Sequence, residues 1–145
     1  NESTLITECA NHFGSQSIVA SIDYKKNIFK QNLQYDHVSR RMLKISVLDA
    51  AINAERLGAG EVLINSTDRD GIMAGLDLET IKLVSNAIKI PLIAAGGAGS
   101  LMHLKEGQVA GASAVAAGSM FVFYGSKRGI LINYPDEFEL CRYVD

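Results

Sequence analysis

The amino-acid sequence predicts an α/β fold built on a parallel β-sheet. Short apolar runs recur along the chain without the clean polar alternation of a half-exposed strand, a pattern typical of strands buried on both faces of a parallel sheet. Segments between the runs carry apolar residues at helical spacing, so helices are expected to connect the strands. The runs are SIVASID (17–23), EVLINSTD (61–68), PLIAAGG (91–97) and ASAVAAGS (112–119).

The first predicted helix precedes the first strand. In NESTLITECANHFG, residues Leu5, Ile6, Cys9 and Phe13 recur at helical spacing, and Gly14 is placed to end the helix. The sequence opens inside this helix and without Met, so we expect the chain to be part of something longer.

Three later helices carry capping signals. Ser46, with Asp49 three residues on, predicts a capping box, and Gly58 occupies the expected C-terminal cap of the same helix. Asp77 is expected to cap the helix that ends before Pro91, and Ser100 the helix that ends at Gly111.

Two segments fall outside this rhythm. Residues 24–44 form a long, charged connection, expected to be a mobile loop or a small hairpin. The topology of the segment after the fourth strand is not predicted. It contains an apolar turn at 119–124, the basic pair Lys127 and Arg128, the run GILINY and a helix led by Pro135.

Composition indicates one globular domain. The chain has 145 residues, of which 48% are hydrophobic and 21% charged. Its net charge of −2 argues against a polyanionic or membrane partner.

Cys9 and Cys141 are not at metal-ligand spacing and favour a reducing, cytoplasmic compartment. No metal or cofactor is predicted. The histidines His12, His37 and His103 lack partners at metal or triad spacing and are expected to be exposed or to act as caps.

Candidate site residues are sought at the strand ends, because chemistry in parallel α/β folds collects at the C-terminal edge of the sheet. The first run ends in Asp23, beside Lys25 and Lys26. Such a carboxylate could be a general acid or base. It could equally be a helix cap or part of a surface ion pair.

The second run ends in a loop with two carboxylates around an arginine. Asp68, Arg69 and Asp70 could bind substrate or hold the loop internally; the spacing favours a structural role for Arg69 and leaves the aspartates open. Gly71 is a plausible place for backbone N–H groups to meet an anion.

The third and fourth runs end in small residues ahead of predicted helices. Gly96, Gly97 and Gly99 precede one helix, and Gly118 and Ser119 precede a short apolar turn. Helix N-termini favour anions, and barrels often hold phosphate between the loops after their last two strands. A tight turn would explain one such loop, but two in succession favour phosphate binding.

In this order, IDYKK, GAGEVLINSTDRDG, IPLIAAGGAG and ASAVAAGS resemble the cyclase subunit of imidazole glycerol phosphate synthase, a (β/α)8 TIM barrel of histidine biosynthesis. The match covers about Phe13 to Phe123 and corresponds to the C-terminal half of the barrel, so residues 1–145 are expected to form one unit with strands five to eight. INSTDRDG and FVFYGSKRGILINYP resemble more closely a branch of the family linked to amidation of surface-polysaccharide sugars.

The resemblance implies a mechanism. In this family a glutaminase partner makes ammonia, which passes through the barrel and attacks a phosphorylated ribulosyl substrate. Asp23 matches one of two acid/base aspartates, and Glu61 matches a charged residue that gates ammonia entry at the opposite end of the barrel. The positions that match phosphate-binding or pocket residues are Ser66, Asp70, Gly71, Gly97, Gly118 and Ser119.

Departures from the family pattern leave alternatives open. Asn65 stands where the histidine enzyme usually has threonine and Ala95 where it often has serine, which favours the sugar-amidation branch. A complete barrel has about 250 residues, so this chain alone is expected to be inactive in cyclisation and to form a homodimer or join an N-terminal half-barrel. A non-catalytic half-barrel that binds phosphorylated ligands or only self-associates is the competing hypothesis. A sister isomerase is disfavoured by DRDG with the upstream GAGE.

Overall fold

A parallel sheet forms the centre of the computed structural model, which describes residues 2–125 and 127–144, without the side chains of residues 2, 3, 141 and 144. The expectation for Cys141 therefore lies outside the described side chains. Each of the four predicted runs contains a strand, and the four pair in parallel in the order β1-β4-β5-β6. These strands are β1 (Val19–Lys26), β4 (Glu61–Ser66), β5 (Leu92–Ala95) and β6 (Ala114–Val115). The predicted α/β class is confirmed.

The connection at 24–44 is a hairpin rather than a mobile loop. β2 (Asn32–Asp36) pairs antiparallel with β1, and β3 (Arg41–Ser46) pairs antiparallel with β2, which extends the sheet beyond β1. β1 itself continues to Lys26. The expectation that the first strand ends at Asp23 is therefore wrong, because pairing with β2 prolongs the strand by three residues past it, 24–26.

Helices follow the predicted order. They are α1 (Glu2–Phe13), the short 3-10 helix η1 (Ser15–Ser17), α2 (Val47–Leu57), α3 (Leu78–Ser85), α4 (Leu101–Val109), α5 (Ser119–Val122) and α6 (Glu137–Val144). The three predicted N-caps are confirmed: the side chains of Ser46, Asp77 and Ser100 accept hydrogen bonds from backbone N–H groups of the first turns. Gly58 ends α2 with φ 105°, as the sequence predicted.

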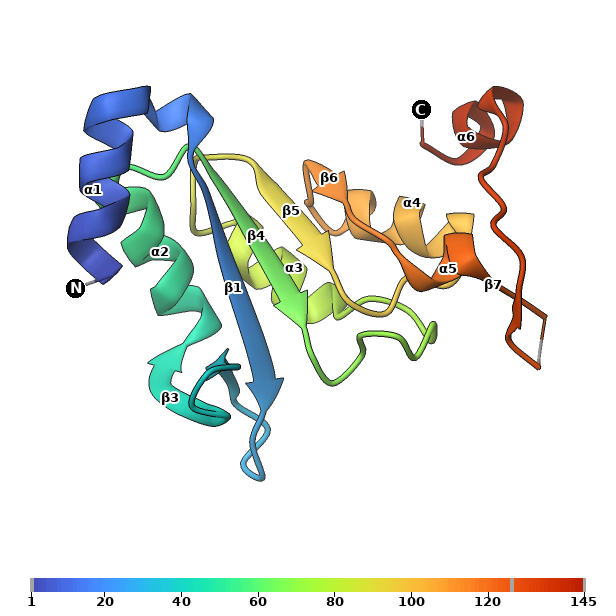
Figure 1. Cartoon of the computed structure of the whole chain (residues 1–145), viewed down its shortest axis with the longest axis horizontal. Helices are drawn as coiled ribbons and strands as arrows, with labels where there is room; N and C mark the ends of the chain where they lie inside the picture. Colours follow the sequence, from blue (N-terminus) through green and yellow to red (C-terminus); the bar gives the residue numbers. More distant parts are fainter. Residues whose placement is uncertain (1, 126, 145) are drawn as a thin grey trace.

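One face of the parallel sheet is covered and the other is open. Ile22, Val62 and Leu92 are at most 4% exposed and belong to the core between the sheet and the helices. Residues that alternate with them are more accessible, and Val19 is 50% exposed. In Figure 1, α3 lies behind β4 and β5, and α2 lies beside β1. The expectation of strands buried on both faces is therefore not met within this chain.

The C-terminal segment lies at the far end of the molecule from the N-terminus (Figure 1). β7 (Phe123–Tyr124) and β8 (Gly129–Ile130) form a separate antiparallel pair, and α6 contacts α4. The helix predicted after Pro135 is confirmed. Its start is a reciprocal capping box in which Glu139 N–H donates to Asp136 Oδ1 at 2.8 Å and Asp136 N–H donates to Glu139 Oε2 at 3.2 Å. No helix of the described segments is long and apolar enough to cross a membrane.

Candidate active site

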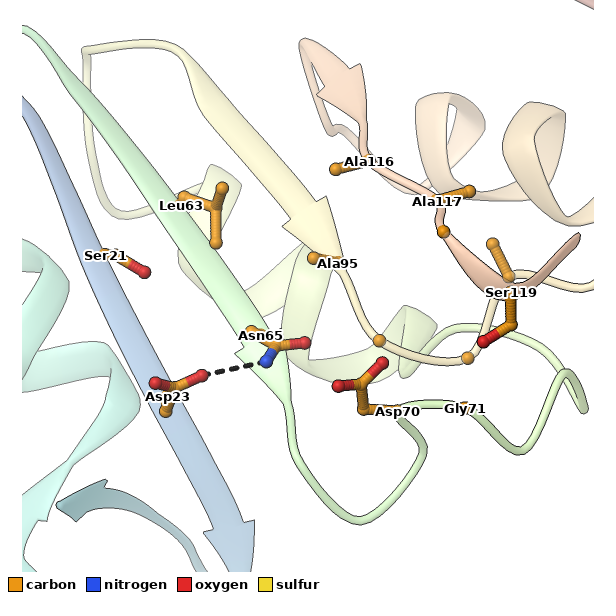
Figure 2. Close-up of a pocket in the computed structure, with 14 residues that line it drawn as sticks. Ser21, Asp23, Leu63, Asn65, Asp70, Gly71, Ala95, Ala116, Ala117 and Ser119 are labelled. Atoms are coloured by element: carbon orange, nitrogen blue, oxygen red, sulfur yellow. Dashed lines mark hydrogen bonds between the residues drawn. The ribbon is translucent and has the colours of Figure 1, made fainter. Parts of the chain in front are cut away.

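A cleft of about 270 Å³ lies at the C-terminal edge of the parallel sheet, on its open face (Figure 2). Parallel pairing brings the ends of β1, β4, β5 and β6 to this one edge, so residues far apart in sequence meet there. The lining residues are Ser21, Asp23, Leu63, Asn65, Asp70, Gly71, Ala95, Gly96, Gly97, Ala98, Ala116, Ala117, Gly118 and Ser119. The cleft therefore contains every predicted site residue except Ser66 and Glu61.

Asp23 is held from two sides. The Asn65 amide donates from Nδ2 to Asp23 Oδ1 at 2.8 Å, as drawn in Figure 2. His37 Nε2 lies 3.4 Å from Asp23 Oδ2, a contact that is ionic when the imidazole is protonated. Because Asp23 lies inside β1 and caps no helix, the helix-cap alternative is excluded. Its side chain is 29% exposed and faces the cleft, as an acid/base residue must.

The glycines after β5 are explained by close packing between loops. Gly96 has φ +88°, and a Cβ there would lie 2.5 Å from the Ser66 carbonyl oxygen. Gly97 has φ +106°, and a Cβ there would collide with the carbonyl oxygen of Gly75, while Gly75 N–H donates to Gly97 O at 2.8 Å. The tight-turn alternative therefore accounts for both glycines without a ligand, although both also line the cleft.

Gly118 is different, because nothing lies within 4 Å of the position its Cβ would take. It precedes α5 with φ −119° and provides no side-chain cap. Across the cleft, a Cβ on Gly71 would lie 4.0 Å from Ser119 Oγ. The cleft thus has open space beside Gly118. The sequence predicted a phosphate between the loops after β5 and β6, which include Gly97 and Gly118, and a possible anion contact at Gly71.

Charge in the cleft comes from two carboxylates, Asp23 and Asp70, and none of the described lysines and arginines lines it. Arg128 contacts the loop after β4 through the backbone: its Nη2 donates to the Gly71 carbonyl at 2.6 Å and to the Ile72 carbonyl at 3.1 Å. Arg128 therefore holds the rim of the cleft in place. An anion bound here would rely on backbone N–H groups and the Ser119 hydroxyl.

Ser66 does not line this cleft, so its expected place in the substrate pocket has no support from the cleft's lining and stays a prediction. Side chains alternate along β4, and Ser66 points to the covered face, where it is 4% exposed. It lines a second, polar cavity of about 380 Å³ with Tyr24, Lys26, Asn32, Asp68, Arg69 and Asp77.

Residues that line the second cavity fix the loop after β4. Arg69 Nη1 donates to the Gly75 carbonyl at 3.2 Å, and Asp68 Oδ2 accepts from the Lys26 backbone N–H at 2.8 Å. The predicted structural role of Arg69 is therefore supported, and Asp68 has a structural contact as well. Only Asp70 of the two loop aspartates reaches the cleft.

Tyr24, on β1, lines the same second cavity. Its hydroxyl donates to Asp77 Oδ2 at 3.5 Å, and the Thr80 hydroxyl donates to the same oxygen at 2.9 Å. Burial, followed by the Asp77 carboxylate, raises the pKa of Tyr24 far above its ordinary value. Tyr24 therefore stays protonated and serves as a donor rather than as a base.

Glu61 lies at the other end of β4 from the cleft, where the strand begins. It shares a face with Leu63 and Asn65, both of which line the cleft, because alternate residues of a strand point the same way. An ammonia-gating role for Glu61 stays a prediction.

Sequence reasoning missed two residues. His37 is exposed, as expected, but the β2–β3 hairpin also brings its imidazole to Asp23, a contact that the sequence did not predict. Arg128 was noted only as part of a basic pair. Neither could be found from spacing, because each reaches its partner through a pairing between distant segments. His103 is confirmed in a capping role, since its Nδ1 accepts from Gly99 N–H at 3.1 Å.

The fold and the cleft together define an α/β protein with a candidate ligand site at the C-terminal edge of a parallel sheet. The sequence profile of the family described as "Histidine biosynthesis protein" matches residues 1–127. The chain belongs to this family.

Curated relatives agree. The chain is 42% identical over 134 residues to a "Putative imidazole glycerol phosphate synthase subunit hisF2" of Pseudomonas aeruginosa, a match that covers 92% of this chain and 53% of the relative. It is 41% identical over 134 residues to a putative HisF subunit of the same synthase from Leptospira interrogans, covering 91% and 53%. With the HisF subunit of Chlorobium phaeobacteroides the identity is 42% over 120 residues, covering 82% and 47%. The chain thus spans about half the length of these relatives.

Proposed function

We propose that this chain is the C-terminal half of a (β/α)8-barrel cyclase of the imidazole glycerol phosphate synthase type, in which residues 1–145 supply strands five to eight. The support is architectural: parallel strands carry their helices on one face, and the opposite, open face ends in the cleft. In a barrel that open face would be the interior.

The proposed reaction uses ammonia from a glutaminase partner on a phosphorylated ribulosyl substrate in histidine biosynthesis. The observation that carries this proposal is the position of Asp23, fixed by Asn65 and facing a cleft whose far side is open at Gly118 and Ser119. Asp23 would act as one acid/base group, and the N-terminal half would provide its partner. Glu61, at the opposite end of the sheet, would face the ammonia entrance.

Amidation of surface-polysaccharide sugars is a second candidate function, in which the barrel delivers ammonia. It is favoured by Asn65 and Ala95, because both departures from the histidine enzyme's pattern line the cleft. The amide of Asn65 also donates a hydrogen bond to one oxygen of Asp23. The residue type at position 65 therefore affects the proposed acid/base group directly.

The chain alone is proposed to be inactive in cyclisation and to dimerise through its open face. Parallel sheets are almost always covered on both faces, and Val19 leaves apolar surface exposed on this one. Sedimentation at micromolar concentration should show a dimer. A stable monomer would contradict the proposed dimer but not the half-barrel proposal.

The function is tested by calorimetric titration of the chain with a phosphorylated ribulosyl analogue. Gly118→Val is the informative variant, because its side chain would enter open space in the cleft with an ordinary backbone φ. Gly97→Val is unsuitable, because it would disturb the loop with or without a ligand. We expect saturable binding that Gly118→Val abolishes while Ile52→Val, an exposed change on α2, preserves it.

If the analogue still binds the Gly118→Val variant, its phosphate does not bind at Gly118. If the analogue binds neither protein, the hypothesis of a non-catalytic half-barrel that only self-associates is favoured. In the completed barrel with its glutaminase, Asp23→Asn should abolish ammonia-dependent turnover and leave substrate affinity within about threefold. Unchanged turnover would remove Asp23 from the acid/base role.

A further inference from the structure

The β2–β3 hairpin carries a histidine to the edge of the cleft. His37 follows the last residue of β2, and its Nε2 lies 3.4 Å from Asp23 Oδ2 on neighbouring β1. The other oxygen, Oδ1, accepts the Asn65 amide at 2.8 Å. The two Asp23 oxygens therefore have different partners, one from β4 and one from the hairpin.

Besides Asp23, the imidazole contacts one aromatic ring of the hairpin. The ring of Tyr35 meets that of His37 edge to face, with centroids 4.9 Å apart, and Lys25 Nζ lies 4.8 Å from the Tyr35 ring centroid. Asp36 stabilises the following turn, since its Oδ1 accepts from Val38 N–H at 2.8 Å and its Oδ2 from the Ser39 hydroxyl at 2.6 Å.

We propose that His37 is a positioning residue for Asp23. It holds one carboxylate oxygen against the hairpin while Asn65 holds the other against β4, so the carboxylate keeps one orientation toward the cleft. The inference rests on the proposed function, because it assigns His37 a role only if Asp23 performs acid/base chemistry.

Exposure suits such a role. The His37 side chain is 61% exposed and that of Asp23 is 29% exposed, so the imidazole exchanges protons with solvent while the carboxylate faces the cleft. The contact is ionic only while the imidazole is protonated, so it is expected to be stronger at lower pH.

Other charges near this pair must be taken into account. Lys25 reaches the Tyr35 ring from β1, Asp36 lies next to His37 on β2, and Asp70 lines the same cleft from the loop after β4. A double-mutant cycle isolates the His37–Asp23 pair from these neighbours because they are present in all four proteins.

The first arm uses the chain alone. Unfolding equilibria are measured for the wild type, Asp23→Asn, His37→Gln and the double variant at pH 5.5 and pH 8.5. We expect a coupling of about two- to fivefold in the unfolding constant at pH 5.5, the range for a partly exposed ion pair, and less than about 1.5-fold at pH 8.5. Coupling absent at both values, or equal at both, would overturn the proposal.

The second arm uses the completed barrel with its glutaminase. His37→Gln should lower kcat about tenfold near pH 6 with KM changed less than about threefold, and the loss should shrink above pH 8. His12→Gln, on exposed α1, is the matched control and should leave the kcat profile unchanged. If Asp23→Asn keeps its turnover, the proposed function fails. If Asp23→Asn is inactive but His37→Gln has the wild-type profile, the assignment of His37 alone is overturned.

Discussion

Asp23 and Asn65 are directly paired in register across the parallel strands β1 and β4, and the Asn65 amide donates to Asp23 Oδ1 at 2.8 Å. Paired residues of neighbouring strands point to the same face, so the sheet itself sets the separation of the two side chains. The proposed acid/base carboxylate therefore lies on a rigid strand and not on a loop.

Removing the amide should cost stability. Asn65→Ala deletes a hydrogen bond to a carboxylate that is partly exposed, and we expect the free energy of unfolding at pH 7 to fall by about 1 kcal/mol. Urea denaturation measures the change. Ser21→Ala, also in the cleft lining, is the control and should shift the free energy by less than about 0.5 kcal/mol. Equal effects of the two variants would mean that the amide contact contributes nothing.

The cleft glycines should respond differently to alanine. Gly96→Ala forces a side chain onto φ +88° and within 2.5 Å of the Ser66 carbonyl, so a loss of about 2 kcal/mol or more is expected. Gly118→Ala meets open space and should change the free energy by less than about 0.5 kcal/mol. Thermal unfolding of both variants without ligand tests the contrast. A large loss for Gly118→Ala would show that Gly118 has a structural role.

Tyr24 should make the chain less stable at alkaline pH. Its pKa is raised in the folded state, first by burial and then by the Asp77 carboxylate, whereas an unfolded tyrosine has a pKa of about 10. The folded state therefore binds the phenolic proton more tightly. This contribution is complete below about pH 10 and is lost as pH rises through the folded pKa.

Tyr24→Phe removes that titration. The variant should be less stable than the wild type at pH 7, by about 1 kcal/mol for the lost hydroxyl contact to Asp77, and the difference should narrow as pH rises above about 10. Denaturation at pH 7, 10 and 11 gives the comparison, with the exposed Tyr134→Phe as control. A difference that stays constant with pH would contradict a buried, protonated Tyr24.

Arg128 should restrain the rim of the cleft. Its guanidinium bonds the carbonyls of Gly71 and Ile72, so Arg128→Ala is expected to raise amide exchange severalfold in the loop 69–75. Hydrogen–deuterium exchange measures this directly, with Lys127→Ala as the neighbouring control of equal charge. Unchanged exchange in both would show that the loop is held by Arg69 and Asp68 alone.

Local features were predictable because they depend on neighbours in sequence. Ser46, Asp77 and Ser100 cap helices through N–H groups only three residues away. The apolar runs were found as strands for the same reason. The end of the first strand at Asp23 was predicted wrongly, because the strand is prolonged to Lys26 by pairing with β2, a segment that is not adjacent in sequence.

The sequence by itself determined the parallel α/β class, the helix caps and the family, since these follow from periodicity, short-range hydrogen bonds and motif order. Tertiary structure alone decided that Gly96 and Gly97 serve loop packing while Gly118 leaves space. It also brought His37 and Asn65 to the two oxygens of Asp23. His37 and Asn65 lie 14 and 42 positions after Asp23 in the sequence, so only strand pairing and register bring their side chains within contact distance of its carboxylate.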